Sequence, residues 1–109
     1  MDWMLWLDDQ YLDPECPARH TPIGFVGAGS TQEAIRVVRD FGPPSFIDFD
    51  HDLGRDDTAK DFLKWLYSNY PNNPPQDWAV HSANPMAKGW IDSFINGWHR
   101  SLRGEPIVG

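Results

Sequence analysis

The sequence predicts a small α/β domain built around an open parallel sheet, and two observations lead to this fold class. Short apolar segments alternate along the chain with amphipathic segments of helical period. Strands that alternate with helices in this way form parallel sheets joined by right-handed crossovers. The length of 109 residues is also typical of one domain. We therefore expect a single domain over residues 1–109, with about four strands in the order 2-1-3-4 and flanking helices.

Four apolar segments are expected to form the strands: residues 3–7, 23–26, 45–50 and 78–81. The first is apolar on both faces, which is typical of a parallel strand covered by helices. Gly27-Ala28-Gly29 is expected to end the second strand. In an open sheet of this order, ligands bind where the strand order reverses, beyond the carboxyl ends of strands one and three.

Three amphipathic segments are expected to form the helices. Ser30 begins the first through a capping box, and Asp57 or Thr58 can cap the second. Asn84 caps the third, with Pro85 at its first helical position. The apolar residues expected to face the core are Ala34, Ile35, Val37 and Val38 in the first helix, Phe62, Leu63, Leu66, Tyr67 and Tyr70 in the second, and Trp90, Ile91, Phe94, Ile95, Trp98 and Leu102 in the third.

The composition limits the classes of function. A formal charge of −7 argues against a broad nucleic-acid surface, because DNA and RNA are densely negative. No signal peptide is readable, and no apolar run approaches the ~20 residues of a membrane span. Cys16 is the single cysteine, so no internal disulfide can form and a cytoplasmic location is expected. Most of the six tryptophans are expected in the core, although Trp6 or Trp78 could stack on a base.

Four aspartates follow the first and third expected strands, where the strand order reverses. Asp8 and Asp9 come after the first strand, Asp50 ends the third, and Asp52 lies two residues further on. Crowded carboxylates repel one another, whereas hard cations such as Mg²⁺ or Mn²⁺ prefer oxygen ligands. One aspartate at a strand end commonly bonds its own backbone. Four of them on adjacent strands favour a divalent metal site.

Two histidines and two small polar residues are expected near the same end of the sheet. His51 lies between two of the aspartates and His81 ends the fourth strand, and either ring could transfer a proton near neutral pH. Ser82 could donate to a phosphate oxygen or open the turn before the last helix. Asn84 is a cap at an electropositive helix end, where an anion would be stabilised.

Three motifs stand in one order along the chain: Leu5-Trp6-Leu7-Asp8-Asp9, Phe49-Asp50-His51-Asp52-Leu53-Gly54 and Val80-His81-Ser82-Ala83-Asn84-Pro85. Together they resemble the cyclic-phosphate processing receiver domain family, a receiver-like branch of the flavodoxin-type α/β fold. The resemblance extends from Trp3 to about Phe94. It implies that Asp8 and Asp9 are metal ligands and that Asp50 occupies the position that accepts a phosphoryl group in ordinary receivers. It also implies action on cyclic or terminal phosphates of nucleotides.

The chain departs from the family pattern in two places. Gln10-Tyr11 follows the aspartate pair where the family usually has Glu-Arg, so a basic residue is missing there unless Arg19 replaces it. Thr58-Ala59-Lys60 replaces the Thr-Gly-Tyr of the family, and Lys60 could supply the lost positive charge to the substrate. No fifth strand with its receiver lysine is readable, so we expect a truncated receiver and no ordinary phosphotransfer signalling.

The leading hypothesis is a metal-dependent phosphoesterase, a hydrolase acting on a small phosphorylated or cyclic nucleotide or on an RNA terminus. Asp8, Asp9 and Asp52 would hold Mg²⁺ or Mn²⁺, and Asp50 would be a further ligand or a nucleophile. His51 or His81 would move the proton, and Ser82, Asn84 and Lys60 would contact the substrate. The first alternative is a non-catalytic receiver-like module that binds a phosphate or nucleotide and a protein partner. The second is an acidic inhibitor or interaction protein.

Overall fold

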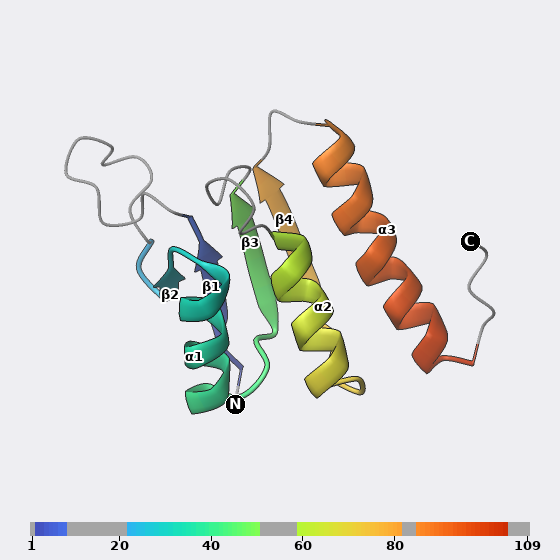
Figure 1. Ribbon diagram of the computed structural model, residues 1–109, viewed down its shortest axis with the longest axis horizontal. Coiled ribbons are helices and arrows are strands. Elements are labelled where there is room, and N and C mark those ends of the chain that lie inside the picture. Colours follow the sequence, from blue (N-terminus) through green and yellow to red (C-terminus); the bar gives the residue numbers. More distant parts are fainter. Residues whose placement is uncertain (1, 9–21, 51–58, 82–84, 105–109) are drawn as a thin grey trace.

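The computed structural model describes residues 2–8, 22–50, 59–81 and 85–104. The elements in chain order are β1 (Met4–Leu7), β2 (Phe25–Ala28), α1 (Thr31–Phe41), β3 (Phe46–Asp50), α2 (Ala59–Asn69), β4 (Asp77–His81) and α3 (Pro85–Leu102). All paired strands are parallel, and the sheet has the order β2-β1-β3-β4 (Figure 1). The predicted fold class and strand order are therefore confirmed.

One face of the sheet is covered by all three helices and holds the hydrophobic core. Leu5 and Leu7 of β1 lie beside Ile47 and Phe49 of β3, and all four side chains are fully buried. We call this the covered face. Figure 1 shows α1 and α2 lying over the strands, with α3 alongside. The helical residues in the same core cluster are Ala34, Val38, Phe62, Leu63, Leu66, Ile91, Ile95 and Trp98.

The alternate strand positions form the other side of the sheet, which we call the opposite face. Met4 of β1 is paired with Phe25 on one side and Phe46 on the other, and all three are half-buried. Trp6 is paired with Gly27 and Asp48. Successive side chains of a strand point to opposite faces, so these residues share the side that points away from the core.

The ends of α1 follow from local hydrogen bonds. The Ser30 hydroxyl accepts the backbone N–H of Glu33 at 3.1 Å, as the capping box predicts. At the other end, Gly42 has a φ of 87° and its N–H donates to the Val38 carbonyl at 2.7 Å. A glycine suits this left-handed conformation because it carries no Cβ.

The predicted limits of the second strand were wrong. Residues 23–26 were expected, whereas β2 runs from Phe25 to Ala28. A turn precedes it, in which Gly24 has a φ of 94° and the Phe25 N–H donates to the Pro22 carbonyl. Gly27 and Ala28 stay in the strand because they continue the pairing with β1.

Two apolar residues assigned to helix core faces were also placed wrongly. Tyr67 of α2 is 41% exposed and Leu102 of α3 is 45% exposed. Tyr67 packs edge-on against Phe94 and Trp98 between the two helices. A helical period identifies an apolar stripe, but the width of the stripe that the neighbouring elements cover depends on how closely they pack.

Among the described residues, no helix is long and apolar enough to cross a membrane.

Candidate functional site

The carboxyl ends of three neighbouring strands bring Asp8, Asp50 and His81 into one row, which we call the terminal row. The last β1–β3 pair is Leu7 with Phe49, and Asp8 and Asp50 are the next residue on each strand. Asp50 is in turn paired with His81 of β4. Neighbouring strands lie ~4.8 Å apart, so the backbones of Asp8 and His81 are separated by about 10 Å. This spacing lets one small ligand contact all three positions.

Asp8 is fixed at the end of β1. Its backbone N–H donates to the Ala28 carbonyl at 3.0 Å, which extends the β1–β2 ladder by one residue. Its side chain is only 1% exposed. A carboxylate removed from water needs compensating charge or hydrogen bonds. The Asp8 carboxylate is therefore suited to binding a cation at the end of β1.

Asp48 is the second buried carboxylate on the same side of the sheet. It is 7% exposed and lies between Trp6 of β1 and Ala79 of β4. Within the part of the chain that the structure describes, Asp8 and Asp48 are the buried charged residues. The sequence assigned Asp48 no role, although its position two residues before Asp50 already put both on one face of β3.

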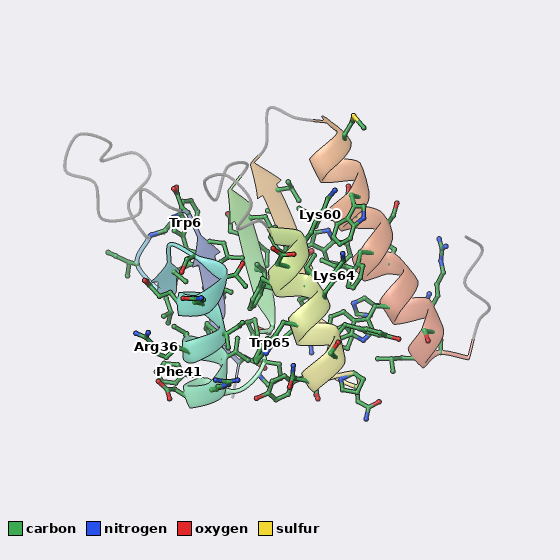
Figure 2. The ribbon with its side chains drawn as sticks, viewed as in Figure 1. Trp6, Arg36, Phe41, Lys60, Lys64 and Trp65 are labelled. Carbon is green, nitrogen blue, oxygen red and sulfur yellow. The ribbon has the colours of Figure 1, made fainter. Side chains whose placement is uncertain are left out.

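Lys60 lies in the first turn of α2, the helix that follows β3. Its ammonium nitrogen lies 5.2 Å from the centroid of the Trp90 ring on α3, in a cation–π contact. Figure 2 shows Lys60 and Lys64 on the side of α2 that faces α3. Such a contact at an exposed site is worth about 0.5–1 kcal/mol. That is small enough for the ammonium to leave the ring for a stronger anionic partner.

The two tryptophans named as candidates for base stacking lie on different faces. Trp78 belongs to the covered side, where its indole N–H donates to Asp92 at 2.9 Å and its ring stacks on His99 at 6.2 Å. Lys88 also donates to Asp92, at 2.7 Å. These two hydrogen bonds, that from Lys88 above all, hold the pKa of Asp92 below its usual range. Trp78 is therefore held against α3 by its contacts with Asp92 and His99. Trp6 belongs to the opposite face.

Several predicted site residues lie outside the described part of the chain: Asp9, His51, Asp52, Ser82 and Asn84. For Asp50 and His81 the structure describes the backbone positions in the strands. Among the side chains described, no three His, Cys, Asp or Glu residues form a group that could hold a metal ion. Asp8, the one predicted ligand whose side chain is described, offers the hard oxygen atoms that Mg²⁺ and Mn²⁺ prefer. The roles of the predicted ligands stay predictions.

A cavity of about 480 Å³ lies at the other end of the strands. Asp2, Ser45, Gln76 and His99 contribute to its lining. His99 is held there by a 2.8 Å hydrogen bond between its Nε2 and the Pro75 carbonyl. Ligands of open parallel sheets bind beyond the carboxyl ends of the strands, so the terminal row is the better candidate.

The parallel sheet of order β2-β1-β3-β4, with an aspartate directly after β1 and another at the end of β3, defines a receiver-like α/β domain. The model of the Cyclic-phosphate processing Receiver domain matches residues 3–97. The chain therefore belongs to this family, as its motifs predicted. Searches of curated proteins and of solved structures gave no match.

Proposed function

We propose that the protein is a metal-dependent phosphoesterase that acts on a cyclic or terminal phosphate of a small nucleotide or an RNA end. The observation that carries this proposal is the register that brings Asp8, Asp50 and His81 to adjacent positions. Membership of a family of cyclic-phosphate processing receivers supports a phosphate ligand. The chain has a formal charge of −7, so a phosphate would need a cation at this end of the sheet.

Asp8, Asp9 and Asp52 would hold Mg²⁺ or Mn²⁺, which when bound polarises phosphoryl oxygens and neutralises their charge. Asp50 is a further ligand or the nucleophile. Ser82, Asn84 and Lys60 would contact the phosphate oxygens.

The reaction adds one water across a P–O bond. If Asp50 attacks first, its carboxylate oxygen bonds to phosphorus while the ring oxygen of the cyclic phosphate leaves. That oxygen takes a proton from His81 or His51. Water then attacks the aspartyl phosphate and gives its proton back to the histidine, which releases a phosphomonoester and restores Asp50.

The test is turnover of 2′,3′-cyclic and 3′,5′-cyclic nucleotides with Mn²⁺, followed by chromatography of the products. Wild type is compared with Asp50→Ala and His81→Ala, and with Asp40→Ala as the control, because Asp40 is an exposed aspartate of α1. General acid–base catalysis contributes about 10²–10⁴-fold, so we expect losses of at least a hundredfold in the two site variants. Asp40→Ala should retain full activity.

Equal rates in all four proteins would contradict the catalytic proposal. Binding of a nucleotide without any product would favour the non-catalytic receiver-like module instead. A protein that binds neither metal nor nucleotide but retains a basic partner would favour the acidic interaction protein.

A further inference from the structure

The opposite face carries an aromatic cluster that the proposed phosphate chemistry does not use. The rings of Trp6 and Phe25 meet edge to face, with centroids 5.9 Å apart and an angle of 74° between the planes. Phe25 and Phe46 meet in the same way, at 5.9 Å and 74°. Trp6, Phe25 and Phe46 are half-buried residues, so none of the three is sealed in the core. The three helices pack on the covered face, so this cluster is not part of their core.

Trp6 is the large side chain in its row across the sheet. Its partner on β2 is Gly27, its partner on β3 is Asp48, and the residue beyond Asp48 is Ala79 of β4. Gly27 contributes no side chain and Ala79 contributes one methyl group. The indole therefore has Gly27, which has no side chain, on one side and Asp48 on the other, and it meets the Phe25 ring edge to face.

The cluster is continuous with the terminal row. Asp8 lies two residues after Trp6 on the same strand, so both belong to the same face and their backbones are about 6.6 Å apart. In a nucleotide, one sugar separates the base from its phosphate. A ligand with its phosphate at Asp8 and Asp50 can therefore lay its base over Trp6.

The size of the opposite face favours a small ligand over a second copy of the chain. Four strands about 4.8 Å apart and four or five residues long, at about 3.3 Å per residue, cover only about 250–320 Å². A stable protein interface buries about 800 Å² on each partner. One base needs only a ring-sized surface, and stacking on an aromatic side chain does not require a particular base.

We propose that Trp6 is the stacking platform for the base of the ligand, so that the substrate class is nucleotides and not base-free sugar phosphates. This inference rests on the proposed function and specifies its substrate. Lys60 lies on α2, away from Trp6 (Figure 2), and would contact the phosphate.

The experiment compares adenosine 2′,3′-cyclic phosphate with 1-O-methylribose 2,3-cyclic phosphate, the same cyclic phosphate without a base, in the presence of Mn²⁺. We expect wild type to process the nucleotide with a kcat/KM at least tenfold higher. Trp6→Leu should lower kcat/KM for the nucleotide about tenfold and leave the base-free compound unchanged. Trp6→Phe should restore most of the loss, because any aromatic ring can stack.

Trp65→Leu is the matched control. Trp65 is a half-buried tryptophan of α2 that stacks on Phe62, on the helical layer of the molecule (Figure 2). It should change neither kcat/KM. The comparison of the two compounds on wild type decides the question even if Trp6→Leu folds poorly.

Equal kcat/KM values for the two compounds in wild type would overturn the stacking inference and leave the phosphoesterase in place. The same holds if Trp6→Leu loses activity equally on both compounds while remaining folded. If wild type processes and binds neither compound, the proposed function fails, and the stacking inference fails with it.

Discussion

The two faces of the sheet are made by the same strands but carry different chemistry. On β3, Ile47 and Phe49 are fully buried under the helices, whereas Phe46 is half-buried and Asp48 holds a carboxylate on the opposite face. β1 divides in the same way between Leu5 and Leu7 on one side and Trp6 and Asp8 on the other. The difference indicates that the covered face supplies stability. The opposite face carries half-buried rings together with the buried carboxylates of Asp8 and Asp48.

The largest expected effect on stability comes from replacing two phenylalanines of β3, one on each face of the sheet. Phe49→Ala should lower the free energy of unfolding by about 3–5 kcal/mol, because it leaves a cavity in the core. Phe46→Ala should cost only about 1–2 kcal/mol, because the ring is already partly in water. Urea denaturation of both variants measures the difference. Equal losses would mean that the opposite face is packed as tightly as the covered one.

The smallest expected effect on stability concerns Asp92, which accepts a hydrogen bond from Trp78 on the covered side. Because Lys88 and Trp78 lower the pKa of Asp92 in the folded state, its carboxylate stabilises the fold above the ordinary aspartate pKa of about 3.9. This contribution is lost as the pH falls through the lowered pKa. The ion pair is exposed and four residues apart on a helix, so it is worth only about 0.3–0.5 kcal/mol.

Asp92→Asn removes this titration. Thermal unfolding between pH 5 and pH 2.5 should therefore show a slightly smaller loss of stability in the variant than in wild type. A steeper loss in the variant would contradict the assignment. Because Asp92 lies on the covered side, the variant should respond to metal as wild type does.

The topology could be predicted from the sequence because each element carries its own signal. Apolar runs such as residues 3–7 predict central parallel strands, and the Ser30 cap marks the start of α1. Strand order then brings Asp8 and Asp50 together without any knowledge of side-chain positions. The roles proposed for these residues do not follow from the topology and remain predictions.

Other features could not be predicted from the sequence, because they depend on how the elements pack in three dimensions. The start of β2 depends on the turn at Gly24, which local propensity did not reveal. The exposure of Tyr67 depends on how α2 and α3 pack, and the attachment of Trp78 depends on Asp92, fourteen residues away in the sequence. A strand such as residues 3–7, apolar on both sides, also gives no sign of which face the helices will cover.

The central claim is that the terminal row is part of a metal site. The most direct test is a titration with Mn²⁺ in which the melting temperature is measured at each concentration and converted to the free energy of unfolding. If the end of the sheet holds a metal ion, Mn²⁺ at a hundred times its Kd should raise the unfolding free energy of wild type by about 2.7 kcal/mol. Asp50→Asn should lose most of this rise, and Asp40→Asn, on the exposed surface of α1, should keep it. No rise in wild type, or an equal rise in Asp50→Asn, would contradict a metal site built on the terminal row.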